Sequence, residues 1–139
     1  MSETFQNKPV TSYCSTLTVK TNFETTLEKV KAALKEQGFN VVSEINMQEK
    51  LKKGANKDIP QYMILGACNP EGAYQAVQSE PNIGVLLPCN VVVRETGNGE
   101  VVVAVVNPMV TMKSAGNEDL RPIAEEISTR LNAVVSSLK

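Results

Sequence analysis

Two cysteines, each set beside a proline and an asparagine, are the residues of this sequence with the clearest chemical potential. Cys68 is followed by Asn69 and a proline, and Cys89 stands between a proline and Asn90. A thiolate can act as a nucleophile or hold a soft metal ion, and an asparagine amide can orient a ligand through hydrogen bonds. We therefore take Cys68, Asn69, Cys89 and Asn90 as candidate ligand-binding residues.

The first reading of these residues is a binding site for a small molecule or a soft metal ion. Leu65, Leu86 and Leu87 lie close to the cysteines in sequence and would give the site an apolar lining. A soft ion such as Cu(I) would need further sulfur ligands, because no C-x-x-C spacing is present. The other soft ligands in the chain that could complete such a site are Cys14, Met109 and Met112.

The second reading is a thiol-dependent enzyme or sulfur carrier that uses Cys68 or Cys89. The chain has no histidine, so Glu44 or Lys50 would have to move protons. A third reading makes the protein a structural dimerisation module, in which both cysteines are small buried apolar residues. The enzyme reading lacks an identifiable base beside the nucleophile, so the binding reading is preferred.

The two thiols are expected to lie close together and to differ in acidity. Cys68 directly precedes a helix start capped by Asn69, where backbone N–H groups and the helix dipole stabilise a thiolate. This position favours a lowered pKa for Cys68, although the carboxylate of Glu71 in the first turn opposes it. Cys68 is therefore the better candidate for a reachable, reactive thiol.

Composition excludes several classes of function. The 14 basic and 15 acidic residues are interspersed and give a net charge of −1, so no basic surface for nucleic acid is expected. The polar start of the chain has no apolar core typical of a signal peptide, and no apolar stretch is long enough to cross a bilayer. Three cysteines without a signal peptide favour free thiols in a reducing cytoplasm.

The hydrophobic pattern predicts a single α+β domain over residues 13–139, after a flexible lead-in over residues 1–12. Thr21 or Asn22 should cap the first helix, and Gly38 and Gly54 should end the first and second helical segments. Strands alternate or run continuously apolar, whereas helices repeat apolar residues every three or four positions. The expected strands are 13–20, 39–45, 61–67, 83–95 (interrupted by Pro88) and 101–107, and the expected helical segments are 21–38, 46–54, 69–80 and 117–139.

Two continuous valine runs suggest that the protein is a homodimer. Val91–Val93 and Val101–Val106 should pair across a tight turn at 96–100, and both runs lack the alternation of a strand with one wet face. Helices would cover one face of this sheet. The other face needs a partner subunit, the inserted helical segments or a ligand to cover it. A second copy of the chain is the preferred cover, because closed two-fold dimers are the commonest oligomers.

The segments "ILGACNP", "PNIG" and "LLPCNVVV", with "GFNV" and "EIN" earlier in the chain, resemble the family catalogued as domain of unknown function 302. The resemblance covers roughly Thr18 to Leu138. It implies a TATA-box-binding-protein-like order of strand, helix, four strands and helix, with a mostly antiparallel sheet, and it implies dimers. It implies no reaction. Asn46 stands where many members carry aspartate, which removes one candidate acid.

Overall fold

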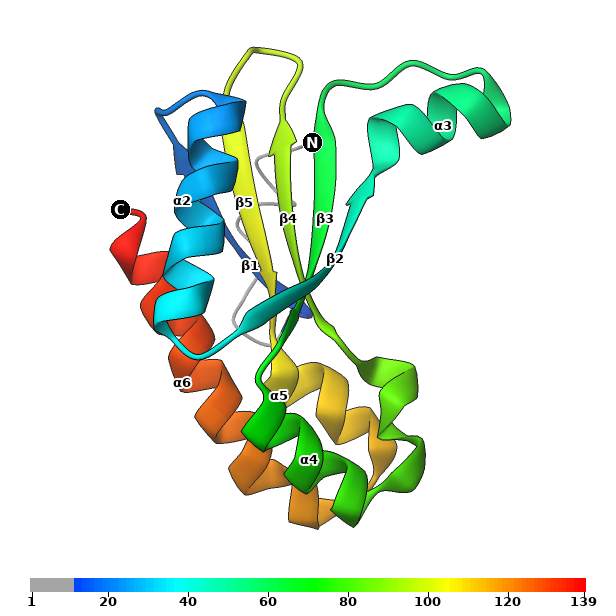
Figure 1. The fold of residues 1–139 in the computed structure, drawn as a ribbon, viewed down its shortest axis with the longest axis vertical. Helices are drawn as coiled ribbons and strands as arrows, with labels where there is room; N and C mark the ends of the chain where they lie inside the picture. Colours follow the sequence, from blue (N-terminus) through cyan, green and yellow to red (C-terminus); the bar gives the residue numbers. More distant parts are fainter. Residues whose placement is uncertain (1–11) are drawn as a thin grey trace.

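The computed structural model describes residues 12–139, so the predicted lead-in over residues 1–12 lies almost wholly outside the described residues. The elements that build the fold are β1 (Cys14–Val19), α2 (Phe23–Glu36), β2 (Asn40–Asn46), α3 (Met47–Ala55), β3 (Tyr62–Cys68), α4 (Pro70–Ser79), η1 (Pro81–Leu86), β4 (Cys89–Glu95), β5 (Val101–Val106), α5 (Pro108–Thr111), η2 (Met112–Ala115), η3 (Glu118–Leu120) and α6 (Arg121–Ser137) (Figure 1).

Asparagine side chains cap four of the α-helices, namely α2, α3, α4 and α5. The Oδ1 atom of Asn22 accepts a hydrogen bond from the backbone N–H of Thr25 at 2.8 Å, which caps α2. Asn46 and Asn69 cap α3 and α4 in the same way. Such a cap satisfies one of the free N–H groups of the first turn and is worth about 1 kcal/mol. The Asn46 side chain thus serves as the cap of α3.

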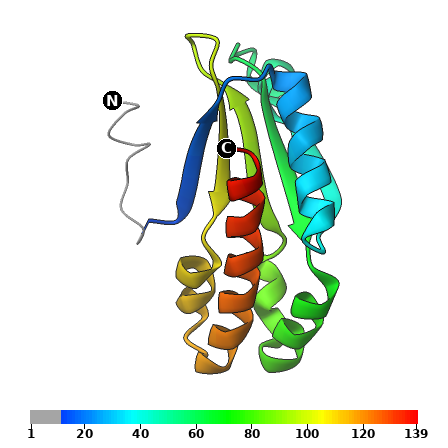
Figure 2. The ribbon, with the colours of Figure 1, turned by 90° about the vertical axis from the view of Figure 1, so that its left-hand side faces the viewer.

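The five strands form one antiparallel sheet in the order β1-β5-β4-β3-β2. Figure 2 shows α2 and α6 side by side over one face of this sheet. The strand residues on that face pack with both helices to form the buried core. Leu65 on β3 and Val91 on β4 are an example, since they pair with one another and both are fully buried. The order of strand, helix, four strands and long C-terminal helix confirms the predicted α+β class.

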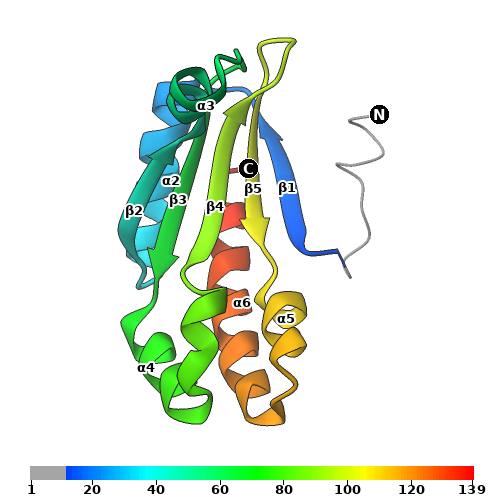
Figure 3. The same cartoon turned by 90° about the vertical axis from the view of Figure 1, so that its right-hand side faces the viewer.

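The other face of the sheet, here called the open face, has no helix over its centre, and Figure 3 shows it flanked by α3 at one end and by α4 and α5 at the other. A row of paired residues crosses it from β2 to β1. Its members are half-buried or exposed, and they are Ile45, Ile64, Val92, Ala104 and Thr16. The helices therefore cover only one face of the continuous valine strands.

Two predicted boundaries were wrong. The second helical segment does not end at Gly54. It ends after Ala55, because Asn56 takes the left-handed conformation at φ 56° and its N–H bonds back to the helix. The segment 83–88 is not a strand interrupted by Pro88. It lies in the 3-10 helix η1 and a short connection, and β4 begins only at Cys89.

The long C-terminal helix begins with Pro122 in its first turn, as predicted, where the missing N–H costs no hydrogen bond. A 3-10 turn, η3, precedes it, and α6 extends beyond the end of the sheet (Figure 1). There α4 and α5 pack against it. Over residues 12–139, no helix has the length and apolar character required to cross a bilayer.

Candidate functional site

A cavity of about 250 Å³ lies where β3 and β4 meet α4 and α6, and we call it the thiol cavity. Both candidate cysteines line it. Its walls come from β2, β3, α4, β4, α6 and the connections beside them. The lining residues are Phe39, Val42, Ala67, Cys68, Asn69, Ala73, Leu87, Pro88, Cys89 and Ile127. Asn69 is the one member of this set with a strongly polar side chain, so the cavity is largely apolar.

The sheet register brings Cys68 and Cys89 together, as expected. Cys89 pairs with Ala67, the residue that precedes Cys68, across the β3–β4 ladder. Adjacent strands lie about 4.8 Å apart, so the two cysteines are close neighbours. The antiparallel return of the chain through α4 and η1 produces this proximity. Both cysteines are free thiols.

The two thiols differ in burial. Cys89 is 7% exposed and belongs to the core, whereas Cys68 is half-buried. Burial and, to a smaller extent, the Coulombic effect of Cys68 together raise the pKa of Cys89 from 9.0 to about 11. A group with this pKa holds its proton at neutral pH. Cys89 is therefore a neutral thiol in the cavity wall.

Asn69, which lines the thiol cavity, links the start of α4 to the residues that follow α2. Its Oδ1 atom accepts from the N–H of Gly72 at 2.8 Å and caps α4, and its Nδ2 donates to the carbonyl of Gly38 at 3.1 Å. Arg130 on α6 donates to the neighbouring carbonyl of Gln37 at 3.0 Å. Gly38 has φ +84°, a left-handed conformation that glycine adopts without strain. The Asn69 amide is thus already engaged in positioning these elements.

Asn90 does not line the thiol cavity. It follows Cys89 in β4, so its side chain lies on the opposite face of the sheet, where it is exposed. It lines another cavity, which Cys89 and Pro88 also border. Around Asn90, β4 pairs regularly with β3 and β5, and the irregularity of the sheet lies in β2 between Val41 and Ser43.

The three leucines expected near the cysteines differ in their positions. Leu87 lines the thiol cavity, and both Leu86 and Leu87 line the cavity that contains Asn90. Leu65 is fully buried in the core. Only one of the three therefore contributes to the wall shared by the two thiols.

The expected proton carriers do not line the thiol cavity. Glu44 on β2 forms an ion pair with Lys31, with 3.1 Å between Nζ and Oε2. Lys50 is exposed on α3, at the far end of the sheet from α4 (Figure 1). Neither residue is in position to act as a base for Cys68 or Cys89.

None of the additional sulfur ligands lines the thiol cavity. Cys14 is on β1, which β5 and β4 separate from β3 in the sheet order, and Met109 and Met112 line a cavity beside α5. Met112 also borders the cavity that contains Asn90, together with Cys89. Within residues 12–139, no three Cys, Asp or Glu side chains gather in a way that could hold a metal ion. The two cysteines would be the sulfur ligands of any soft ion in the thiol cavity.

Several residues that line the thiol cavity were not predicted from the sequence. Phe39 and Ile127 are buried core residues, and the hydrophobic pattern around them does not distinguish a core residue that borders a cavity from one that does not. Val42 reaches the cavity because the β2 irregularity between Val41 and Ser43 leaves it unpaired. Such a bulge turns a side chain away from the regular alternation, and the sequence has no signal for it.

Comparisons with known proteins give a family but no activity. The model of the family described as "Domain of unknown function DUF302" matches residues 15–138. A crystal structure of an uncharacterized conserved protein DUF302 from Bacillus stearothermophilus has a TM-score of 0.85 and 28% sequence identity, over 91% of this chain and 98% of that chain. No curated protein matches the sequence. The chain therefore belongs to the DUF302 family, whose order of strands and helices it shares.

Proposed function

We propose that the protein binds a small, uncharged and mainly apolar molecule in the thiol cavity. The observation that carries the proposal is an apolar cavity of about 250 Å³ with two neighbouring free thiols in its wall. Ligand sites are typically concave and apolar, with a few polar groups that fix orientation. Cys68 and Cys89 would supply those groups as weak hydrogen-bond donors.

The size of the cavity limits the ligand. Pockets for drug-sized molecules measure roughly 300–1,000 Å³, and an engineered apolar cavity of about 150 Å³ binds benzene. A volume of about 250 Å³ lies between these cases. The fitting ligand is a single or fused aromatic ring, or a short branched hydrocarbon with one polar group.

The state of Cys89 favours this ligand over a soft metal ion. A metal binds the thiolate, so binding to a thiol with a pKa of about 11 must displace a tightly held proton. Apart from the Asn69 amide, which is already bonded to Gly72 and Gly38, the other lining side chains are apolar. An uncharged molecule needs no such proton release, and it replaces water against apolar walls.

Indole serves as a probe of the proposal, because it has an apolar body and one N–H group. In a Cys14→Ser background, indole at about 10 mM should slow alkylation of Cys68 by iodoacetamide, since even a ligand with a Kd near 1 mM is then bound on most molecules. Replacing Ala73 with leucine places extra carbon atoms in the cavity. The A73L variant should lose most of this protection. The rates are measured by mass spectrometry of the labelled peptide.

The matched control is Ala32→Leu, which makes the same change at an exposed position of α2, outside the cavity. It should keep the protection seen in the parent protein. The proposal fails if indole leaves the alkylation rate unchanged in every variant. A second contradicting result would be that Cu(I), and not indole, slows alkylation of Cys68, and does so only when Cys89 is present. That pattern would assign the cavity to a soft metal ion.

We also infer that a second copy of the chain covers the open face. The apolar row that includes Ile64, Val92 and Ala104 is half-buried in the single chain. Beside that face lies α3, and none of its nine residues is buried. A helix this short is marginal in water without packing. A two-fold dimer would bury the open face of both copies and give α3 a neighbour.

The mass in solution tests this inference. Light scattering at micromolar concentration should give twice the chain mass of 15.1 kDa. Val92→Glu places a charge in the centre of the open face and should yield monomers. The comparable change Val85→Glu, at a valine that is 86% exposed on η1, should leave the dimer intact. A wild-type mass near that of a single chain would contradict the inference.

A further inference from the structure

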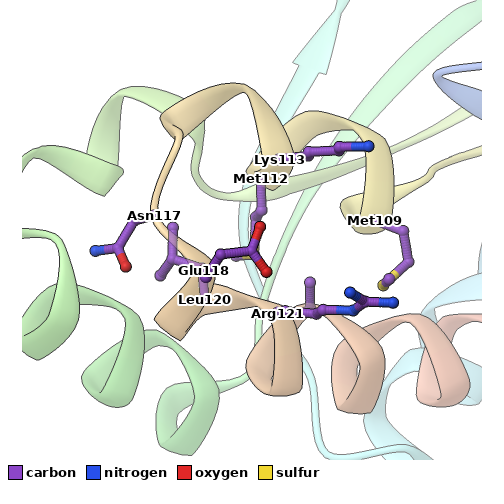
Figure 4. A pocket seen from close by; sticks show the side chains of 8 residues that line it. Met109, Met112, Lys113, Asn117, Glu118, Leu120 and Arg121 are labelled. Atoms are coloured by element: carbon purple, nitrogen blue, oxygen red, sulfur yellow. The ribbon is translucent and has the colours of Figure 1, made fainter.

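A separate cavity of about 190 Å³ lies between α5, η2, η3 and the first turn of α6, and we call it the methionine cavity. It shares no lining residue with the thiol cavity, so it stands apart from the function proposed above. Figure 4 shows the cavity from close by. Its lining residues are Met109, Met112, Lys113, Asn117, Glu118, Leu120, Arg121 and Ala124.

The base of the methionine cavity is apolar. Met112, Leu120 and Ala124 are each no more than 3% exposed, and Met109 is half-buried beside them. Methionine side chains are flexible and polarisable, so they adapt to apolar groups of different shapes. This surface fits a short aliphatic or thioether side chain.

Both signs of charge surround this apolar base. In Figure 4, the charged ends of Lys113 and Arg121 lie on the same side of the cavity as Met109. The carboxylate of Glu118 lies nearer the turn that precedes α6. Within residues 12–139, Lys113 and Glu118 take part in no ion pair. Arg121 contacts Glu125 at 3.5 Å between Nε and Oε2. Two cations and one carboxylate are therefore presented to the same cavity.

Asn117 fixes the segment that carries Glu118. Its Nδ2 donates to the carbonyl of Ser79 at 3.0 Å and to Oε1 of Glu80 at 3.1 Å, both at the end of α4. Its Oδ1 accepts from the N–H of Asp119 at 2.9 Å. In Figure 4 the Asn117 side chain accordingly points away from Glu118. Fixing this backbone restricts the positions that the exposed Glu118 side chain can reach, which lowers the ordering cost when a ligand binds.

From this arrangement we propose that the methionine cavity binds a free α-amino acid with an apolar side chain. The α-carboxylate contacts Lys113 and Arg121, and the α-ammonium contacts Glu118. The side chain packs on Met109 and Met112. A simple organic anion would leave Glu118 facing like charge, and a simple cation would face Lys113 and Arg121, so a zwitterion matches the charges best.

The volume agrees with such a ligand. At about 190 Å³, the cavity is smaller than the roughly 300–1,000 Å³ of pockets that hold drug-sized molecules. Amino acids of the size of leucine or methionine are the ligands that match this volume. Its charged groups remain near the exposed side chains of Lys113, Glu118 and Arg121, while its apolar end reaches the buried base.

The experiment compares leucine with the two molecules that lack one of its charges, namely isoamylamine and 4-methylpentanoate. Binding is followed by the ¹³C methyl signals of Met109 and Met112 in the full-length protein. Leucine should shift both signals and saturate below about 10 mM, which corresponds to a Kd of about 1 mM or lower. Each single-charge analogue should bind at least about tenfold more weakly, because a hydrogen bond to a charged group is worth about 1.5–3 kcal/mol.

Two variants assign the charged contacts. Glu118→Gln should weaken leucine about tenfold and leave 4-methylpentanoate unchanged or tighter, whereas Lys113→Gln should weaken both. Glu100→Gln and Lys57→Gln are the matched controls, because these residues are exposed and outside the cavity. The proposal is overturned if leucine moves neither methyl signal, if the analogues bind as well as leucine, or if the control variants lose affinity equally.

Discussion

Replacing Gly66 with alanine should destabilise the protein by about 1–3 kcal/mol, the usual range for an overpacked core position. Gly66 is a buried residue of β3 opposite Asn90. A Cβ atom at this position would meet the Ser43 hydroxyl and would lie 2.8 Å from Cγ of Pro88. The hydroxyl can rotate away, but the proline ring is rigid and has to move together with the chain that carries it.

The change should also weaken binding in the thiol cavity, because Pro88 is part of its wall. We expect a lower midpoint in urea unfolding and loss of the indole protection of Cys68 in the folded protein. Adding Ser43→Ala removes the hydroxyl contact and leaves the contact with Pro88. The double variant should therefore regain only part of the lost stability.

Gly54→Ala is the control for the general effect of adding a methyl group. Gly54 lies within α3, and a Cβ atom there would meet nothing within 4 Å. Alanine favours a helix over glycine by up to about 1 kcal/mol, so this variant should be as stable as the parent or more stable. Equal stability of Gly66→Ala and the parent would show that the close approach of Pro88 places no constraint on residue 66.

Features governed by neighbours in sequence could be predicted from the chain. Asn69 followed by a proline has the geometry of a helix start, and the structure places both residues there. The apolar run Val101–Val106 likewise predicted a strand, which the structure ends one residue before the expected limit of 107. In these cases the deciding interactions are local caps, turns and backbone preferences, which the sequence contains in full.

The residues 83–88 show where local reasoning fails. Isoleucine, valine and leucine are typical of strands, yet this segment forms η1 and its connection to β4. Ile83 is buried while Val85 is 86% exposed, a pattern set by packing of this segment against α4. Tertiary contacts override a weak β-propensity, and those contacts cannot be read from neighbouring residues.

The candidate site was predictable in part for the same reason. Cys68 and Cys89 stand out by residue type, and their proximity followed from a helix that returns the chain to its own strand. Asn90 was assigned to the same site because it is next to Cys89 in sequence, but alternation along β4 turns it to the other face. Ile127 comes from α6, which only the folded chain brings to the cavity.

The stability of the protein should fall as pH rises from 9 to about 11, and Cys89 should account for part of that fall. The folded state holds the Cys89 proton up to a pKa of about 11, because burial penalises the thiolate and the charge of Cys68 adds to that penalty. The unfolded state releases it near 9.0. Between these values the unfolded state binds fewer protons, so its free energy drops relative to the folded state as pH increases.

The contribution is fully present below pH 9 and is lost on the way to pH 11. A shift of two pKa units corresponds to about 3 kcal/mol. Lysines and tyrosines titrate in the same range, so the comparison has to isolate Cys89. Cys89→Ala removes the titrating group, and Cys14→Ala removes a half-buried thiol on β1 that is not in the thiol cavity.

Urea unfolding of the three proteins at a series of pH values gives the required difference. Cys89→Ala should start less stable at neutral pH, since deleting a buried side-chain atom costs packing. Its free energy of unfolding should then decline less between pH 9 and 11 than that of the wild type, by up to about 3 kcal/mol, whereas Cys14→Ala should decline in parallel with the wild type. Parallel decline of all three proteins would mean that Cys89 ionises as readily in the folded chain as in the unfolded one. In that case the thiol cavity would be open to water, and the preference for an uncharged ligand over a soft metal ion would lose its physical basis.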